Sequence, residues 1–163
     1  MAKSFREKHD GHKYPPKVET LDKPWAGLQK GQTIGIATPK HMSAYFQKIP
    51  RGETRTIEDL RASIAKQLKA DAACPMTTGI FCRIAAEAAL EEIAEGAKPA
   101  EVAPFWRLID PKSPLAKKLS CGPDFIREMR QLEGVSSTEN DAKKKKPTQA
   151  AAKNAKKTSS SKT

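Results

Sequence analysis

The chain has 163 residues, a net charge of +11 and a mean hydropathy of −0.65. This length suits one domain with a hydrophobic core and loose ends. No run approaches the roughly 18 consecutive apolar residues of a membrane helix, and residues 1–16 lack the apolar centre of a secretory signal. We therefore expect no membrane association and no secretion.

The cysteines form an odd set, Cys74, Cys82 and Cys121, without the close pairs typical of metal ligands. In a reducing compartment such residues usually stay free thiols and serve as small packing residues. We therefore expect no metal and no cofactor.

The positive charge gathers at the two ends of the chain. Residues 1–40 carry 8 basic and 4 acidic side chains, residues 41–135 carry 14 and 13, and residues 136–163 carry 8 and 2. Prolines interrupt the first segment, so residues 1–38 are predicted to be a basic, mostly irregular arm. Residues 136–163 are rich in Lys, Ala and Ser and are predicted to be disordered. Such arms attract a polyanion, which could be DNA, RNA or anionic lipid.

Between the arms, the first predicted elements are a short strand at 33–38 and a helix at 39–48 that ends before Pro50. Thr56 is a suitable N-cap for a second helix, with Asp59 completing a capping box. Apolar residues then follow at helical spacing and form one stripe: Ile57, Leu60, Ile64 and Leu68.

A break at 70–76 precedes a third predicted helix at 78–95, which ends at Gly96. Two helices joined by a short break indicate a helix-turn-helix, whose second helix would read DNA. An extended segment is predicted at 104–109, then a basic loop, and then a last helix at 123–133.

The order of these parts resembles the DNA-binding domain of alkylguanine-DNA alkyltransferases. The similar segments are 49–56 (IPRGETRT), Thr78-Gly79, 104–109 (PFWRLI) and 132–135 (LEGV). The resemblance implies a mainly α, winged-helix-like domain at 39–135 with short strands. It further implies duplex DNA as partner, minor-groove binding and a role in DNA repair.

The resemblance also implies that the alkyl-transfer chemistry is lost. The family's reactive motif is Pro-Cys-His-Arg, and Phe105 and Trp106 occupy the Cys and His positions here. A phenyl ring has no nucleophilic atom, and indole is not a base near neutral pH. Ile57 stands where the family has the tyrosine that helps to rotate the base. We therefore expect no catalytic residue.

Several residues are expected to hold DNA. Arg83 matches the arginine that fills the gap left by a flipped base, although a phosphate contact or a pair with Glu87 are alternatives. The small residues Thr77, Thr78 and Gly79 would let the backbone approach the groove closely. Further expected contacts are Arg107, Lys117, Lys118, Lys143, Lys144, Lys145 and Lys146, and a residual base pocket would be lined by Ile57, Phe105, Trp106, Ser120 and Cys121.

The leading hypothesis is a monomeric, non-catalytic DNA-binding protein that recognises damaged or distorted duplexes and recruits a repair partner. It would lie in the cytoplasm with the nucleoid, or in the nucleus of a eukaryote. Three alternatives stay open: an alkyltransferase that uses Cys121 or Cys82, a general DNA-coating protein, and a protein-interaction module that has lost DNA binding. For the first of these, Cys82 lies beside Arg83, whose charge is expected to lower the pKa of the thiol.

Overall fold

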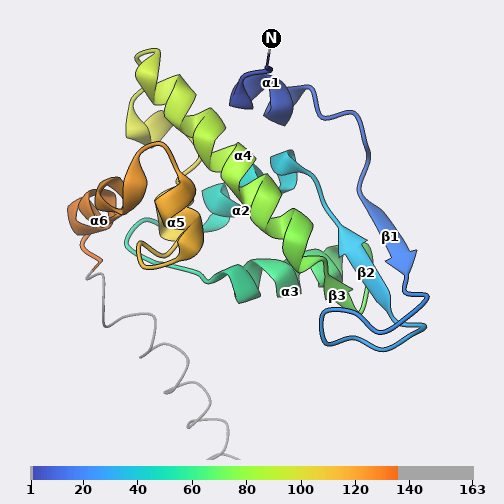
Figure 1. The fold of residues 1–163 in the computed structure, drawn as a ribbon. Helices are drawn as coiled ribbons and strands as arrows, with labels where there is room; N and C mark the ends of the chain where they lie inside the picture. Colours follow the sequence, from blue (N-terminus) through green and yellow to red (C-terminus); the bar gives the residue numbers. More distant parts are fainter. Residues whose placement is uncertain (1, 136–163) are drawn as a thin grey trace, which may run out of the picture.

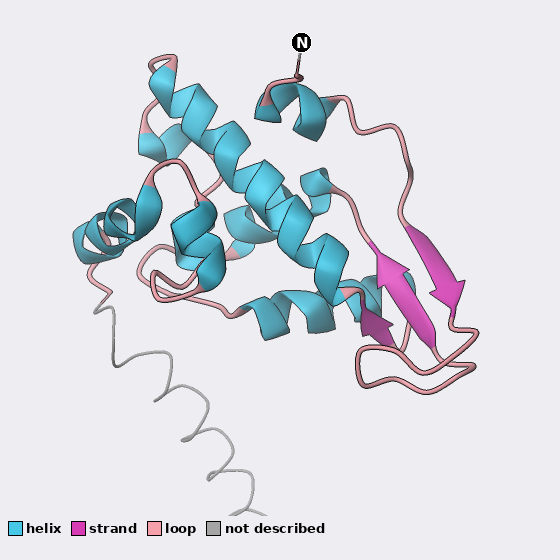
Figure 2. Cartoon of the chain, viewed as in Figure 1, coloured by secondary structure: helices cyan, strands magenta, loops and turns pink. Residues whose placement is uncertain are grey.

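The computed structural model describes residues 2–135, so the predicted tail with Lys143–146 lies outside the described residues. Figure 1 shows shorter helices and short strands around one long helix, and Figure 2 shows that helices make up much more of the fold than strands do. The expected mainly helical class with short strands is confirmed. Within residues 2–135 no helix is long and apolar enough to cross a bilayer.

The elements are α1 (Phe5–Asp10), β1 (Lys17–Thr20), β2 (Thr33–Ile36), α2 (Pro39–Lys48), α3 (Ile57–Leu68), β3 (Ala72–Ala73), α4 (Pro75–Ala94), α5 (Pro114–Lys118) and α6 (Gly122–Leu132).

The N-terminal segment differs from the predicted irregular arm. Ser4 caps α1 in a capping box with Glu7, and the backbone amides of Phe5 and Arg6 each donate to the Glu91 carboxylate at 2.9 Å. β1 pairs antiparallel with β2, which pairs parallel with β3 in the order β1-β2-β3. The acceptor for α1 lies more than 80 residues away, so a local pattern gives no sign of this docking.

Helices α2 and α3 occupy the predicted ranges. Thr38 caps α2 ahead of Pro39, whose fixed φ suits the first helical position. The predicted capping box of α3 is present: the Thr56 amide donates to Asp59, and the Asp59 amide donates to the Thr56 hydroxyl. The left-handed conformation of Lys69 (φ 56°) then ends α3. The local sequence is sufficient here because each signal lies within one helical turn.

Helix α4 is the central element and begins at Pro75, earlier than the predicted residue 78. It runs diagonally across the molecule in Figure 1, in contact with α1, α2, α5 and the turn at Phe105–Arg107. Its buried side includes small residues, which allow neighbouring helices to approach closely: Cys82, Ala85, Ala86, Ala88 and Ala89. Since α4 is buried on several sides over its C-terminal half, a purely amphipathic pattern is a poor guide to its ends.

The predicted extended segment at 104–109 is wrong, because Phe105–Arg107 forms a 3₁₀ turn in the core. The buried Arg130 guanidinium organises this turn: Nε donates to the Trp106 carbonyl at 2.7 Å and Nη2 donates to the Ile109 carbonyl at 3.2 Å. Buried carbonyls require such donors. The turn therefore depends on α6, which supplies Arg130 from 21 or more residues further along the chain.

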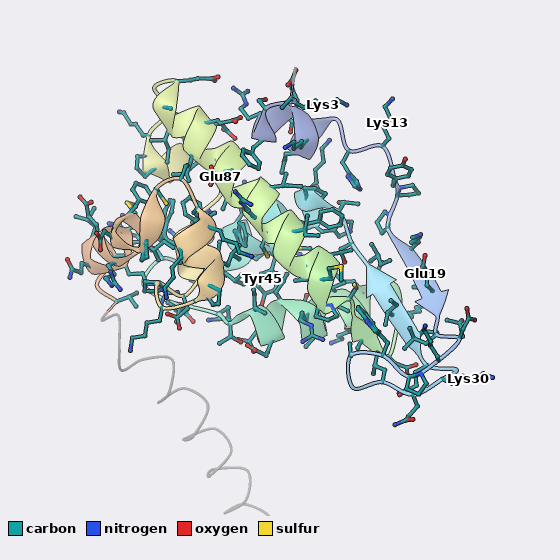
Figure 3. All side chains as sticks on the ribbon, in the orientation of Figure 1. Lys3, Lys13, Glu19, Lys30, Tyr45 and Glu87 are labelled. Carbon is teal, nitrogen blue, oxygen red and sulfur yellow. The ribbon has the colours of Figure 1, made fainter. Side chains whose placement is uncertain are left out.

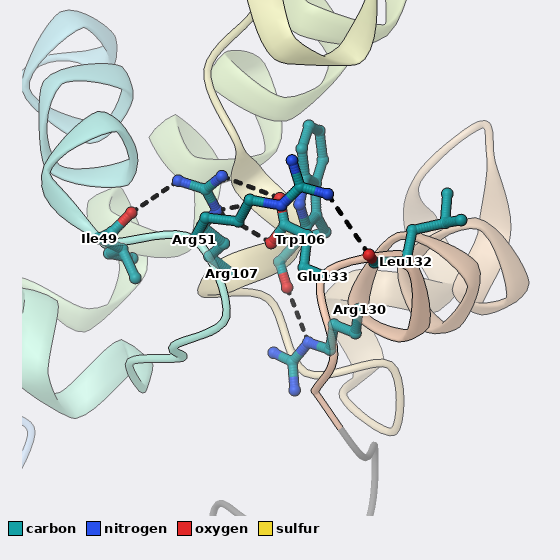
Figure 4. A network of polar contacts seen from close by, with 7 residues as sticks. All are labelled: Ile49, Arg51, Trp106, Arg107, Arg130, Leu132 and Glu133. Carbon is teal, nitrogen blue, oxygen red and sulfur yellow. Dashed lines mark hydrogen bonds and ion pairs between the residues drawn. The ribbon is translucent and has the colours of Figure 1, made fainter.

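Arg107 ties the same turn to two other elements (Figure 4). Its Nε and Nη2 donate to both Glu133 carboxylate oxygens, at 3.0 Å and 2.8 Å. Its Nη1 donates to the Ile49 carbonyl at the end of α2, at 2.7 Å. A bidentate guanidinium–carboxylate pair of this kind is directional and strong.

The pKa of Glu133 is held below its usual range. Burial alone would raise this pKa, but hydrogen bonding from Arg107 and Trp106 and the charges of Arg107 and Arg51 outweigh it. Among the described residues the Trp106 indole nitrogen has no acceptor at hydrogen-bonding geometry, so we attribute the lowered pKa chiefly to Arg107. Glu133 therefore stabilises the fold in its ionised form.

Glu133→Gln should lower the free energy of unfolding by about 3 kcal/mol near pH 7, because it leaves the half-buried Arg107 charge without its carboxylate. The loss should shrink as pH falls below the ordinary glutamate pKa of 4.5, since protonation then removes the same charge from the wild-type protein. Urea unfolding at several pH values measures both effects. The exposed Glu128→Gln on α6 is the control, and an equal loss in both variants would contradict the assigned role of Glu133.

Candidate nucleic-acid interface

The N-terminal half of α4 exposes one side to solvent. Met76, Ile80 and Arg83 follow at helical spacing and share this side; Met76 is 61% exposed and Ile80 is 50% exposed. Gly79 lies on the same side, where an added Cβ would meet no atom within 4 Å. We name this surface, Met76, Gly79, Ile80 and Arg83, the α4 stripe. It combines apolar side chains, one cation and a position without a side chain.

The start of α4 places the predicted small residues differently from expectation. Because Cys74 is the N-cap and Pro75 begins the helix, Thr77 and Thr78 lie inside the first turn. Thr78 is only 2% exposed and its hydroxyl donates to the Cys74 carbonyl at 2.7 Å. Thr78 is thus a buried helix residue, and the prediction that it contacts DNA is wrong; Thr77, which is half-buried, and Gly79 still border the exposed side.

Arg83 extends from the α4 stripe toward the N-terminal segment. Its guanidinium carbon lies 5.8 Å from the centroid of the Phe5 ring, a cation–π distance. The expected alternative partner, Glu87, is buried and accepts from the Ser120 amide at 2.6 Å and the Ser120 hydroxyl at 2.7 Å. Since Glu87 is engaged with Ser120, Arg83 keeps its charge at the surface.

Three other predicted DNA contacts, Arg107, Lys117 and Lys118, have different surroundings. Arg107 is committed to Glu133 and Ile49 inside the fold (Figure 4), so the prediction that its side chain holds phosphate is wrong. Lys117 and Lys118 are exposed in the last turn of α5, and the ion pairs of residues 2–135 include neither of them.

The predicted base pocket is not assembled. Phe105 and Trp106 are fully buried, and both pack on Phe125, with ring centroids 5.9 Å and 6.3 Å away. Ile57 borders a cavity of about 280 Å³ with Leu108 and Leu115, whereas Trp106 borders a separate one of about 520 Å³. Ser120 and Cys121 lie at the start of α6, where Ser120 binds Glu87. The large rings gain more from burial in the core than from lining an open pocket.

Two of the thiols, Cys82 and Cys121, have surroundings that favour the protonated form. Burial raises the pKa of the Cys82 thiol to about 12, which corrects the expectation of a lowered value. Burial, followed by the negative charge of Glu87, raises the pKa of Cys121 to about 11. A thiolate is the nucleophilic form of cysteine, so neither environment activates sulfur. Within residues 2–135 no cluster of three His, Cys, Asp or Glu side chains has metal-binding geometry.

Sequence reasoning missed the residues that the N-terminal segment brings to α4. Phe5 lies beside Arg83, and the Lys8 ammonium nitrogen lies 4.7 Å from the centroid of the same ring. His12 packs edge-on against Phe81, with a centroid distance of 5.1 Å. Ser4 and Glu7 have the spacing of a capping box, which is the one local signal that a helix begins there.

The chain was compared with protein-family models, with curated proteins and with solved structures, and none of them matches. Its function is therefore inferred from its own geometry. The exposed α4 stripe, the engaged Arg107 and the unactivated thiols are the features on which that inference depends.

Proposed function

We propose that this chain is a non-catalytic DNA-binding protein that recognises distorted or damaged duplexes, with α4 as the reading helix. In this proposal α3 and α4 act as a winged-helix-like helix-turn-helix. The observation that carries it is the α4 stripe: a central helix with a buried inner side leaves Met76, Ile80 and Arg83 exposed together on one side. A stable fold gains nothing from exposing two large apolar side chains together, so a binding role is favoured.

The composition of the stripe favours the minor groove. Proteins that bind there often insert apolar side chains such as Met and Ile between base steps and use Arg beside them. Gly79 leaves open space between these side chains, so the helix backbone can approach the groove closely. Insertion costs less where base pairs are already weakened, which gives a preference for damaged DNA.

The absence of catalysis in this proposal rests on the residues around the turn at Phe105–Arg107. Phe105 and Trp106 are core aromatics without a nucleophile or a base. The thiols of Cys82 and Cys121 have raised pKa values. An alkyltransferase with a relocated thiol is therefore the weaker alternative.

A protein-interaction module is the stronger alternative, because Met76 and Ile80 would also suit an apolar protein surface. The net charge of +11 favours DNA, since Lys and Arg release counterions from phosphates. A general DNA-coating protein would bind intact and damaged duplexes with equal affinity, whereas a damage-recognition protein would bind the damaged duplex more tightly.

Binding to plain, mismatched and alkylguanine duplexes at two salt concentrations tests these functions. The wild-type protein should prefer the mismatched and alkylated duplexes. Ile80→Gln should abolish this preference while leaving binding to plain duplex nearly unchanged, because the wedge acts only where bases unstack. Leu132→Gln on α6 is the matched control, since Leu132 is also an exposed apolar residue. Equal affinity for all duplexes would favour DNA coating, and no binding would favour the protein-interaction module.

Arg83→Gln should weaken binding to every duplex about tenfold, because a charged hydrogen bond contributes about 1.5 kcal/mol or more. Fluorescence anisotropy with labelled duplexes measures the change. Arg127→Gln, an exposed arginine on α6 that pairs with Asp124, is the control. Unchanged affinity of the Arg83 variant would argue against α4 as the DNA-contacting helix.

The thiol environments predict slow, pH-dependent alkylation. With a pKa of about 11, the reaction of Cys121 with iodoacetamide should accelerate about tenfold per pH unit from pH 7 to 10, because only the thiolate reacts. A thiol with the ordinary pKa of 9.0 would instead be half-maximal at pH 9 and level off above it. Mass spectrometry of the native protein identifies the modified residue, and an adduct after incubation with alkylguanine DNA would support the alkyltransferase instead.

A further inference from the structure

The two sides of α1 differ in charge. One side borders an open surface hollow of about 910 Å³ whose charged lining is Lys3, Arg6, Glu7, Asp10, Glu91 and Glu95. The other side borders a cavity of about 350 Å³ lined by Lys3, Lys8, His12, Lys13 and Tyr14, among others. Asp10, Glu91 and Glu95 therefore line only the first of these hollows and Lys8 and Lys13 only the second, while Lys3 and Glu7 border both.

The carboxylates near α1 are engaged within the protein. Glu91 accepts the amides of Phe5 and Arg6, and Glu95 pairs with the Arg6 guanidinium. Glu7 accepts the Ser4 amide at 2.7 Å, and Asp10 binds the His9 ring at 2.7 Å. Each of these four carboxylates thus has a partner within the protein, although the side chains of Asp10 and Glu95 are 64% exposed.

The cations on the opposite side keep no such partner. Across residues 2–135 the ion pairs include none with Lys3, Lys8, Lys13 or Arg83. The Phe5 ring instead brings Lys8 and Arg83 to one place. Figure 3 shows Lys3 and Lys13 on the N-terminal segment, projecting outward along one edge of the molecule. Gathering like charges is unfavourable unless an anion binds between them.

Tyr14 adds a polar aromatic group to this cationic side. It is 76% exposed and packs edge-on against His12, which itself packs against Phe81 of α4. A tyrosine hydroxyl is a common phosphate donor in protein–DNA contacts. Tyr14 thus adjoins Lys13 and lies next to a His12 ring that is itself packed on α4, with most of its own surface open to a ligand.

We propose that the N-terminal segment is a docked part of the DNA interface, in which Lys3, Lys8, Lys13 and Tyr14 bind backbone phosphates beside Arg83. This inference rests on the proposed function and extends it. The α4 stripe would enter the groove, and the docked segment would hold the adjoining phosphate backbone and set the orientation of α4. The segment differs from a loose basic arm because the Glu91 carboxylate fixes it on α4.

The number of phosphate contacts is measured from the salt dependence of binding by the full-length protein. Lys8→Gln/Lys13→Gln should make the slope of log K against log salt shallower by roughly 1.8, since each phosphate contact contributes about 0.9. The control Lys48→Gln/Lys98→Gln removes the same charge from exposed sites elsewhere and should change the slope much less. Equal changes in both double variants would overturn the proposal.

Docking is tested separately with Glu91→Ala. This change removes a negative charge. If the N-terminal segment is a loose arm, the variant should bind DNA equally well or more tightly. If the segment must be docked on α4, the variant should bind at least threefold more weakly. Tighter or unchanged binding would overturn the docking. Circular dichroism checks that the variant keeps its helices, and Glu92→Ala, which removes the same charge one residue further along α4, is the control.

Failure of this inference and failure of the proposed function give different results. If the wild-type protein binds no duplex, both fail. If it binds and the lysine variants follow their control, only the docked interface fails. If vesicles of phosphatidylserine and phosphatidylcholine bind in a Lys8- and Lys13-dependent manner while DNA binding does not change, the segment recognises lipid phosphate and the proposal is wrong.

Discussion

Two arginines on the inner side of the fold determine how its C-terminal half is arranged. Arg130 reaches from α6 to the carbonyls of Trp106 and Ile109, while Arg107 reaches from the turn to Glu133 and to Ile49. Together they connect the end of α2, the buried turn and the end of α6. Without these donors the 3₁₀ turn would leave buried carbonyls unsatisfied, at a cost of about 1–3 kcal/mol each. The aromatic pair Phe105 and Trp106 would then lose its fixed place in the core.

The resemblance implies that the segment at 104–109 and the reading helix serve one DNA site. In this structure the turn at Phe105–Arg107 belongs to the core, and only α4 offers an exposed surface of the two. The turn at Phe105–Arg107 is structural, since its aromatic rings fill the core and its arginine forms an internal ion pair. The exposed chemistry lies instead on the first half of α4 and on the segment that packs beside it. Because α4 is held from behind by the core and the turn, its exposed side is rigid. A rigid helix suits recognition of DNA shape, since little ordering entropy is lost on binding.

The sequence predicted best where the signals are local. Thr56 with Asp59 and Thr38 with Pro39 specify helix starts within one turn, and both helices follow. The turn at Phe105–Arg107 could not be predicted, because the donor that permits it comes from Arg130 on another helix. The N-terminal helix could not be predicted with confidence from composition either, since its stability depends on Glu91. For the candidate site, Arg83 and Gly79 were found by resemblance, whereas Met76, Ile80, Phe5 and Lys8 required the tertiary structure.

The position of Arg83 connects the core of the protein with its proposed interface. Glu87, one turn further along α4, is drawn inward by Ser120 and is therefore unavailable as the partner that helical spacing would suggest. Glu91, one further turn along, is used by the amides of α1. Two successive carboxylates on α4 are thus consumed by internal contacts, and the cations that they would otherwise neutralise stay at the surface. In the proposed function, Arg83 is the cation of α4 that these internal contacts leave without an ion pair and that the helix would present to DNA.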